Sequence, residues 1–217
     1  MRILVVAATL FEVEILKSEV DSQEMNSGKT DSRLKTQDLE LLITGVGMVA
    51  TAFALGKHLA NQQYDLAINL GIAGSFDRDI VLGEVVEVVE DQLSELGAED
   101  DETFLPIEAL GFGESRFNAT AGLSDFGQSS LKKVRAITVN TVHGHEPSIQ
   151  KLSGRIQSQL ESMEGAAFFY ACKQAGVPCL QIRAVSNYVE KRNRDAWQIG
   201  LAIKNLNNFA AELLKVL

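Results

Sequence analysis

Short runs of apolar residues alternate along this chain with segments of helical spacing and with glycine-rich stretches. The apolar runs predict buried strands at residues 2–8, 39–44, 65–70, 85–89, 134–141 and 179–185. The helical spacing predicts helices at residues 11–20, 48–61, 147–155 and 195–217, and a further helix that ends before Gly176. Repeated strand-to-helix units without a linker or an internal repeat predict an α/β protein with a single domain over residues 1–217.

The helices are defined by their apolar positions, and two other segments lack any such pattern. The first helix is predicted from the spacing of Phe11, Ile15 and Leu16. In the second helix the residues expected to face the core are Val49, Phe53, Ala54 and Leu55. In the last helix they are Trp197, Leu201, Leu206, Phe209 and Leu213. Residues 22–35 are polar and predict an exposed loop or hairpin. The acidic residues 94–117 predict a long excursion over the surface, of the kind that serves as a lid or a partner contact.

Polar residues interrupt the apolar pattern most clearly between residues 161 and 190. Glu164 falls just before a helix, where the positive end of the helix dipole favours a carboxylate. The apolar strand after that helix contains Arg183 and opens into Ser186 and Asn187. Because ligands of open α/β sheets bind at the carboxyl ends of the strands, we expect chemistry at this point of the chain.

Composition narrows the classes of function that remain. The chain has 217 residues, of which 46% are hydrophobic and 23% are charged, as in ordinary globular proteins. Its net charge of −9 argues against nucleic acid as the main partner, because phosphate contacts require a basic face. The apolar N-terminal run is too short for a signal sequence, and no stretch approaches the roughly 20 apolar residues of a membrane span, so we expect a cytoplasmic protein.

The cysteines and histidines predict no metal site. Cys172 and Cys179 form no metal or redox motif and are expected to be buried, reduced and hydrophobic in role. His143 and His145 lack a third neighbour of ligand type at zinc spacing, so either could equally be a surface residue.

Two glycine-rich segments follow predicted strands. Residues 45–50 match a Gly-x-Gly-x-x-Ala turn with Asp65 twenty residues after Gly45, but Asp65 starts a strand rather than ending one, which favours tight packing over a dinucleotide site. A second turn is predicted at residues 71–75. Its exposed N–H groups could hold an anion or a ribose, and the competing explanation is a plain tight turn without a ligand.

Individual acidic, basic and amide residues each have an ordinary structural explanation as well. Glu12 alone would be a solvated helix residue. Glu164 and Arg183 both lie among apolar residues and need partners if they are buried, and a structural ion pair is the competing explanation. Asn187 could cap the turn after its strand.

Taken together, these segments resemble the nucleoside phosphorylase and nucleosidase superfamily, particularly the methylthioadenosine/S-adenosylhomocysteine nucleosidases and the futalosine hydrolases. The likeness rests on the first strand with Glu12, on residues 45–47 and 71–75, on Met163-Glu164-Gly165-Ala166 and on Arg183-Ala184-Val185-Ser186-Asn187. It implies a three-layer nucleoside phosphorylase-like α/β fold, with a central mixed twisted sheet flanked by helices. It also implies a small purine nucleoside substrate, no metal or organic cofactor, and a homodimer or larger homo-oligomer in which a neighbouring subunit borders the site.

The resemblance also implies roles for individual residues. Glu12 would be the base that positions and deprotonates the attacking water, and Glu164 would bind the ribose hydroxyls with Met163 packed against the sugar. The other residues implied to bind substrate are Gly74, Ser75, Val142, His143, Arg183 and Ser186. Cleavage of an N-glycosidic bond passes through a cationic ribosyl species, which nearby carboxylates stabilise.

Asn187 stands where adenine-specific nucleosidases have Asp. An amide can donate to a 6-oxo group while accepting from a protonated N7, although it cannot act as a general acid. The substitution therefore favours a hypoxanthine leaving group and, within the family, hydrolysis of futalosine in menaquinone biosynthesis.

Four other functions remain open on the sequence. They are a methylthioadenosine/S-adenosylhomocysteine-type nucleosidase, a 6-oxopurine nucleoside phosphorylase, a nonenzymatic nucleoside-binding regulator and a dinucleotide-dependent enzyme. The phosphorylase is disfavoured because Glu12 would repel phosphate. For the benzoate end of futalosine, Arg116, Arg192 and Arg194 are all candidates.

Overall fold

The computed structural model describes residues 1–16, 38–127 and 131–217. The strands are β1 (Arg2–Ala7), β2 (Asp38–Ile43), β3 (Leu66–Ser75), β4 (Val85–Leu93), β5 (Gly97–Asp100), β6 (Thr103–Pro106), β7 (Arg116–Asn118), β8 (Lys132–Thr138), β9 (Leu160–Ser162) and β10 (Cys179–Tyr188). The α-helices that lie wholly within the described residues are α2 (Met48–Leu59), α3 (Glu146–Ser153), α4 (Gly165–Ala175) and α5 (Ile199–Val216), and the 3-10 turns are η1 (Leu10–Glu12), η2 (Leu123–Phe126) and η3 (Arg194–Ala196).

A mixed sheet forms the centre of the protein and closes partly on itself. Its order is β10-β4-β8-β9-β3-β1-β2, and β10 also pairs with β3, so that β3, β10, β4, β8 and β9 form a ring from which β1 and β2 extend. The pairs β1–β2, β1–β3, β3–β10, β4–β8 and β8–β9 are parallel, whereas β4–β10 and β3–β9 are antiparallel. The predicted mixed twisted sheet is therefore present, with a closure that the sequence pattern did not indicate.

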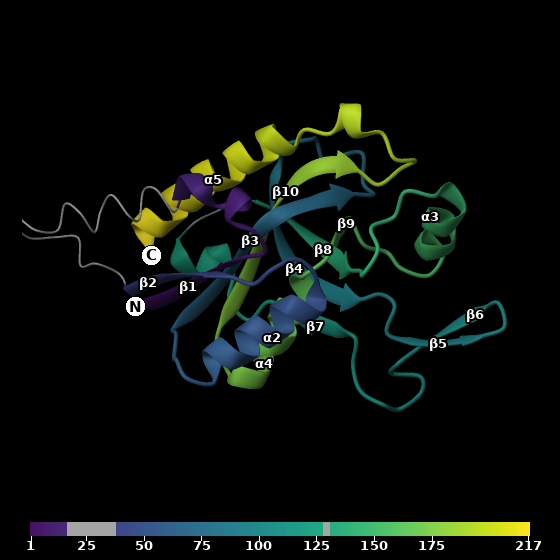
Figure 1. The fold of residues 1–217 in the computed structure, drawn as a ribbon, viewed down its shortest axis with the longest axis horizontal. Coiled ribbons are helices and arrows are strands. Elements are labelled where there is room, and N and C mark those ends of the chain that lie inside the picture. The colour runs from purple at the N-terminus through teal and green to yellow at the C-terminus, as the bar shows by residue number, and fades with distance from the viewer. Residues whose placement is uncertain (17–37, 128–130) are drawn as a thin grey trace, which may run out of the picture.

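Helices cover both faces of this sheet (Figure 1). On one face α4 packs with α2, and Phe168, Phe169 and Leu55 are buried among the strands there. On the other face α5 buries Leu206 and Leu213 against β1, β3 and β10. The two cores give the three layers that the resemblance implied.

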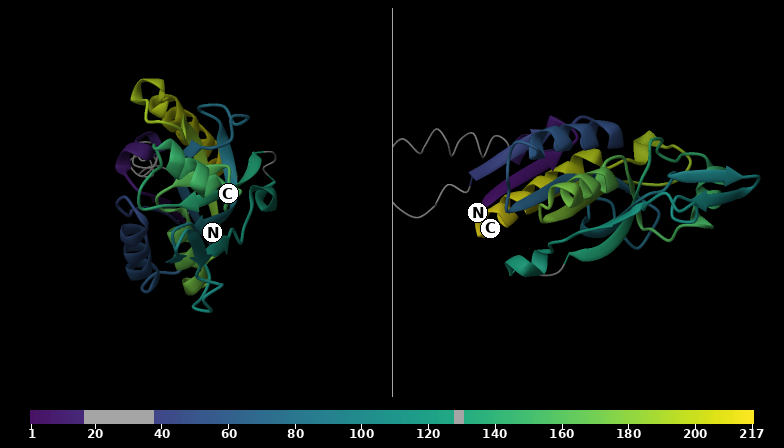
Figure 2. Two further views of the ribbon diagram at one scale, coloured as in Figure 1. Left: turned by 90° about the vertical axis from the view of Figure 1, so that its right-hand side faces the viewer. Right: turned by 90° about the horizontal axis from the view of Figure 1, so that it is seen from below.

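The segment between β4 and β8 leaves the body of the protein. Its strands β5 and β6 form an antiparallel hairpin that projects away from the main sheet, as Figures 1 and 2 show from three directions. The surface excursion predicted at residues 94–117 is thus confirmed, although it contains a hairpin and ends in β7, which rejoins β4.

Several local predictions are wrong. Residues 71–75 are not a turn but the second half of β3, because the glycines there pack against neighbouring strands. Val49 and Phe53 are 77% and 72% exposed, so the buried side of α2 is instead the one with Thr51 and Leu55.

Exposed positions also occur among the other predicted helical stripes. Phe11, Ile15 and Leu201 are exposed, and Trp197 precedes α5 rather than lying in it. Residues 14–16 are helical, while the remainder of the first predicted helix and the loop predicted at 22–35 lie outside the described residues. Within the part of the chain that the structure describes, no helix combines the length and the apolar character needed to cross a membrane.

Candidate active site

Glu12 and Arg183 both approach Gly71, near the carboxyl end of β1. Glu12 lies in η1, directly after this strand, and is 8% exposed. Its Oε2 accepts hydrogen bonds from the N–H of Thr9 at 3.0 Å and from the Thr9 hydroxyl at 3.1 Å, and its Oε1 accepts from the N–H of Ile72 at 3.2 Å. A carboxylate offers about four acceptor positions, so one on Oε1 remains for a ligand or a water molecule.

Arg183 is buried in β10, with 1% of its surface exposed. Its Nη1 donates to Oδ1 of Asn69 on β3 at 3.1 Å, whereas its Nε and Nη2 have no hydrogen-bond partner among the described residues. Gly71 makes this arrangement possible, because a Cβ there would lie 2.5 Å from Nη1 of Arg183 and 3.0 Å from Oε1 of Glu12. Unpaired buried N–H groups are costly, so the guanidinium is suited to meet a bound oxygen.

Glu164 precedes α4 as its N-cap residue and reaches across to the loop after β2. Its Oε1 accepts a hydrogen bond from the N–H of Gly47 at 2.9 Å. Burial raises the pKa of the Glu164 carboxyl, while the positive charge of Arg183 and the hydrogen bond from Gly47 oppose that rise. The glycine-rich turn at residues 45–47 thus holds a carboxylate of the protein.

A buried polar network of side chains from the sheet packs against the first turn of α4. The hydroxyl of Thr138 accepts from the N–H of Ala166 at 2.7 Å and donates to Oδ1 of Asp91 at 2.8 Å. The second oxygen of Asp91 accepts from Nε2 of Gln181 at 3.0 Å. A Cβ at Gly165 would lie 1.9 Å from that oxygen, so the network is packed directly against the residue that follows Glu164.

Asp91 is fully buried, and burial raises the pKa of its carboxyl to about 6. The hydrogen bonds from Gln181 and Thr138 and the charge of Arg183 act in the opposite direction. The sequence does not indicate that Asp91, Thr138 and Gln181 form a network, because each is a single polar residue in a different strand. Only the order of β4, β8 and β10 in the sheet brings them together.

Ser186 and Asn187 lie at the end of β10, and Asn187 is paired with Gly74 of β3. The hydroxyl of Ser186 lies 2.9 Å from Oδ1 of Asn187 and 3.2 Å from the carbonyl oxygen of Ala73, so its single proton is shared between them. Nδ2 of Asn187 donates to the carbonyl oxygen of Tyr188 at 3.1 Å. These contacts assign the two ends of the amide, and among the described residues they leave one N–H and one lone pair of Asn187 free.

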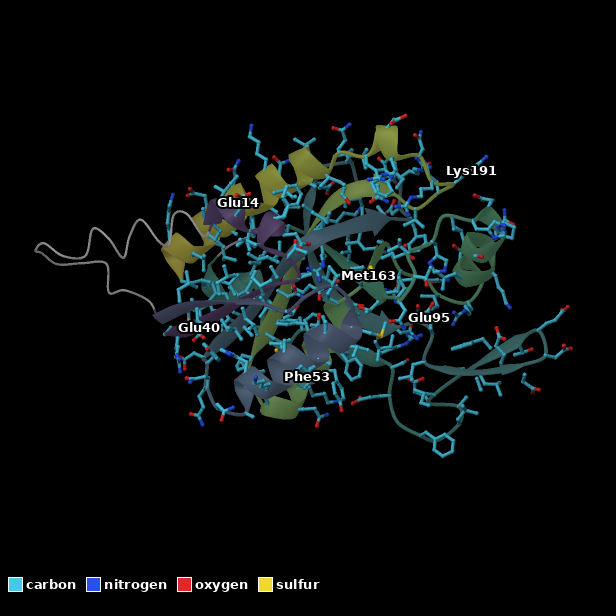
Figure 3. All side chains as sticks on the ribbon, in the orientation of Figure 1. Glu14, Glu40, Phe53, Glu95, Met163 and Lys191 are labelled. Atoms are coloured by element: carbon cyan, nitrogen blue, oxygen red, sulfur yellow. The ribbon has the colours of Figure 1, made fainter. Side chains whose placement is uncertain are left out.

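His143 follows β8 and lies against β9. Its backbone N–H donates to Glu161 Oε1 at 2.8 Å, and its Nδ1 hydrogen-bonds to the other oxygen of the same carboxylate. Burial raises the pKa of the Glu161 carboxyl, and its contacts with His143 oppose the rise. Val142 beside it is exposed, and Met163 is half-buried next to Glu164 (Figure 3).

The predicted site residue Ser75 offers no free group. It is 1% exposed, and its hydroxyl contacts the carbonyl oxygens of Asp77 at 2.8 Å and Gln159 at 3.2 Å while accepting from the N–H of Asp77. A direct contact of its side chain with substrate is therefore disfavoured, and Ser75 serves to fix the end of β3. His145 is also apart, since its ring contacts the hydroxyl of Ser148 at the start of α3.

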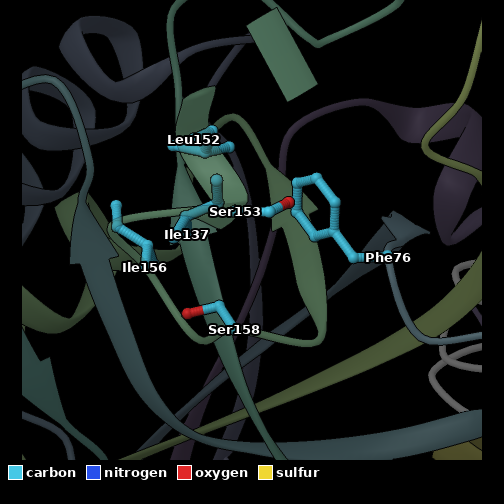
Figure 4. A pocket seen from close by; sticks show the side chains of 6 residues that line it. All are labelled: Phe76, Ile137, Leu152, Ser153, Ile156 and Ser158. Carbon is cyan, nitrogen blue, oxygen red and sulfur yellow. The ribbon is translucent and has the colours of Figure 1, made fainter. Parts of the chain in front are cut away.

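Two cavities in the described part of the chain lie outside this cluster. One of about 10 Å³ sits between α3 and the sheet and is lined by Phe76, Ile137, Leu152, Ser153, Ile156 and Ser158 (Figure 4). That volume accommodates at most one water molecule. A larger hollow of about 510 Å³ lies against the outer side of α2, beside Glu40, Phe53 and His58.

The chemistry that the cluster can perform follows from its charges. Two carboxylates, Glu12 and Glu164, flank one buried guanidinium, and an amide with free donor and acceptor positions stands at the end of the same strand as Arg183. No group of three His, Cys, Asp or Glu residues suited to a metal ion occurs in the described ranges. The arrangement fits stabilisation of a cationic intermediate and activation of water.

Comparisons with known proteins identify the family and the fold. The family model of the phosphorylase superfamily matches residues 2–217. The chain is 35% identical to the futalosine hydrolase of Streptomyces coelicolor, over 82% of this chain and 79% of that protein, and 32% identical to the one of Thermus thermophilus, over 83% of each. It also superposes with a TM-score of 0.80 on a methylthioadenosine/S-adenosylhomocysteine nucleosidase from Colwellia psychrerythraea in complex with adenine, at 22% identity over 100% of this chain and 96% of that one.

Proposed function

The chain belongs to the phosphorylase superfamily and to its futalosine hydrolase family, and we propose that it hydrolyses the N-glycosidic bond of futalosine to release hypoxanthine. Dehypoxanthine futalosine is the other product, and the reaction serves menaquinone biosynthesis. The observation that carries the choice of base is the amide of Asn187, which keeps a free N–H and a free acceptor at the end of β10.

Glu12 is the general base in this proposal. Water attacks C1′ of the ribose and gives a proton to the free acceptor position on Oε1 of Glu12, while the electrons of the C1′–N9 bond pass to the purine. The hydrogen bonds from Thr9 and Ile72 hold the carboxylate in one orientation. The unpaired N–H groups of Arg183 then donate to an oxygen of the ribose or of the attacking water.

Glu164 binds the ribose hydroxyls and stabilises the positive charge that develops on the sugar. Its contact with Gly47 uses one acceptor position and leaves the others for hydroxyl donors. Met163 packs against the sugar, and residues 142–143 and Gly74 border the purine. The pair of His143 with Glu161 fixes the backbone of that border.

Asn187 donates its free N–H to O6 of hypoxanthine and accepts from N7 when that atom carries a proton. An aspartate at this position would place a negative charge beside the carbonyl oxygen of Tyr188, which the amide now hydrogen-bonds. The amide therefore favours 6-oxopurines over the 6-aminopurines of methylthioadenosine/S-adenosylhomocysteine nucleosidases.

The rival reaction within the superfamily is phosphorolysis. It requires an anion where Glu12 stands, and residues 9–12 contain no arginine or lysine that would hold phosphate. Purified protein should therefore release hypoxanthine from inosine or futalosine at the same rate with and without phosphate. A rate that rises in proportion to phosphate would identify a phosphorylase instead.

We further propose that the protein acts as a homo-oligomer of single-domain subunits in the cytoplasm. Val46, Val49 and Phe53 are 57%, 77% and 72% exposed around the start of α2, next to the Gly47 that binds Glu164. An exposed apolar patch beside the site fits coverage by a second copy of this chain. Val49→Glu with Phe53→Glu should yield monomers in sedimentation experiments; an unchanged mass would exclude this surface. The two buried, unbridged cysteines support a reducing compartment.

A further inference from the structure

Two arginines surround the single tryptophan of the chain near the candidate site. The guanidinium carbons of Arg192 and Arg194 lie 5.0 Å and 5.9 Å from the ring centre of Trp197, within the range of cation–π attraction. We call these three residues the arginine–tryptophan cluster. The half-buried indole keeps both cations in one place.

Backbone contacts place this cluster beside the residues proposed to bind the nucleoside. The N–H of Gln198, which follows Trp197, donates to the carbonyl oxygen of Ser186 at 2.8 Å. On the other side, a Cβ at Gly144 would lie 3.6 Å from Cβ of Arg192. The cluster therefore lies between the end of β10 and the loop that contains His143.

The two cations of the cluster have no ion-pair partner among the residues that the structure describes. The nearby carboxylate of Glu190 is already paired with Arg78. On a chain with a net charge of −9, two unpaired arginines at one place form a local positive region. Such a region is suited to an anion, and the planar guanidinium matches a carboxylate in particular.

We propose that the arginine–tryptophan cluster binds an aryl carboxylate, the benzoate end of the substrate. The inference rests on the proposed function, because futalosine differs from inosine by the benzoate-bearing group attached beyond the ribose. Arg192 and Arg194 hold the carboxylate, and Trp197 gives the aryl ring an apolar neighbour. The third candidate, Arg116, lies in β7, which pairs with residues 90–92 of β4 rather than with the end of β10, and we give it no part in this binding.

A 5′-phosphate is the other anion that two arginines could hold. The proposal commits to the aryl carboxylate because Trp197 contributes an aromatic surface that a phosphate does not use. Inosine 5′-monophosphate therefore serves as a second anionic probe. The two arginines should raise the kcat/KM for inosine 5′-monophosphate by less than twofold relative to their effect on the kcat/KM for inosine.

The experiment compares futalosine and inosine in wild-type protein and in the Arg192→Ala/Arg194→Ala double variant. The variant should lose about tenfold to hundredfold in kcat/KM for futalosine, mostly through KM, and stay within about twofold for inosine. Lys133→Ala/Arg135→Ala is the matched control, since both are exposed cations on β8 and their removal changes the net charge of the chain by the same two units. It should leave both substrates unchanged.

Binding provides a readout that is independent of turnover, because Trp197 is the sole source of tryptophan fluorescence. Futalosine should change that fluorescence more than inosine does, and the double variant should need at least about tenfold more futalosine for half the change. Binding without turnover would refute the proposed hydrolysis and leave this inference standing. The inference would be overturned if the double variant lost kcat/KM equally for futalosine and inosine, or lost it for neither. It would also be overturned if the arginines raised kcat/KM only for inosine 5′-monophosphate.

Discussion

Glu12 and Arg183 approach each other across the bare Cα of Gly71. A Cβ on that residue would come within 2.5 Å of Nη1 of Arg183 and 3.0 Å of Oε1 of Glu12. The proposed base and the buried cation beside it are thus set in position by the absence of a side chain on β3. This relationship explains why a glycine-rich segment lies inside a strand rather than in a turn.

Gly71→Ala should therefore damage the site. The added methyl group must push the guanidinium or the carboxylate aside, and a displacement of about 1 Å of a reacting group costs about 10²-fold in rate. We expect that loss in kcat, with about 1–3 kcal/mol of lost stability from overpacking. Steady-state kinetics and urea unfolding measure the two effects.

Gly56→Ala is the matched control for that variant. Gly56 lies in α2 with no atom near its Cβ direction, so alanine should stabilise the helix by about 0.5–1 kcal/mol and leave kcat unchanged. If Gly71→Ala keeps the wild-type rate, the close approach of Glu12 and Arg183 has no part in catalysis.

Glu12→Gln should depress kcat by about 10²- to 10⁴-fold, the usual contribution of a general base, with a small effect on KM. The fold should persist by circular dichroism, because glutamine keeps an acceptor for Thr9. Glu14→Gln tests the same change on an exposed neighbour, which is labelled in Figure 3 and should behave as the wild type does. A near-normal rate for Glu12→Gln would remove Glu12 from the mechanism.

Asn187→Asp should shift base preference toward 6-aminopurines. A carboxylate can accept from the 6-amino group of adenine but cannot donate to O6 of hypoxanthine. We expect the ratio of kcat/KM for methylthioadenosine to that for inosine to rise about tenfold or more. Asn208→Asp, on the exposed side of α5, is the control. An unchanged ratio would show that Asn187 does not face the base.

Asp91 should make stability depend on pH. Its carboxyl has a pKa of about 6 in the folded protein against a usual value of 3.8, so between pH 4 and pH 6 the unfolded chain has released a proton that the folded protein still holds. Raising the pH through this window therefore lowers the free energy of unfolding by up to about 3 kcal/mol relative to a variant that cannot ionise there.

Asp91→Asn is that variant. Its oxygen can still accept from Thr138, and its NH₂ can donate to Oε1 of Gln181 once the Gln181 amide turns over, because Nε2 faces that position in the wild type and Oε1 has no partner among the described residues. The difference in unfolding free energy between variant and wild type should grow in favour of the variant from pH 4 to pH 7. If the unfolding free energies of variant and wild type changed in parallel with pH, Asp91 would not be the source of the pH dependence of stability.

Much of the fold could be predicted from the apolar runs, since the strands at residues 2–8 and 179–185 are buried on both faces and show it in sequence. The helix at residues 48–61 was also predicted, but the burial of Val49 and Phe53 was not, because an apolar stripe does not reveal whether a helix packs on its own chain or on another surface. The sequence predicts a turn at residues 71–75 because strands seldom contain two glycines. Their role depends on Arg183, more than a hundred residues away.

The candidate site also could be predicted only in part from the sequence. Glu12, Glu164 and Asn187 could be found because each is a polar residue at the end of an apolar element. The network of Asp91 with its two partners could not, since its members are scattered over three strands. Their contacts depend on the position of β4 between β8 and β10 in the sheet.

The most direct test of the central claim is the identity of the base released by purified protein without phosphate. Futalosine should yield hypoxanthine and dehypoxanthine futalosine in equal amounts, and methylthioadenosine should be cleaved far more slowly. Comparable turnover of methylthioadenosine, or no release of hypoxanthine from any 6-oxopurine nucleoside, would contradict the assignment.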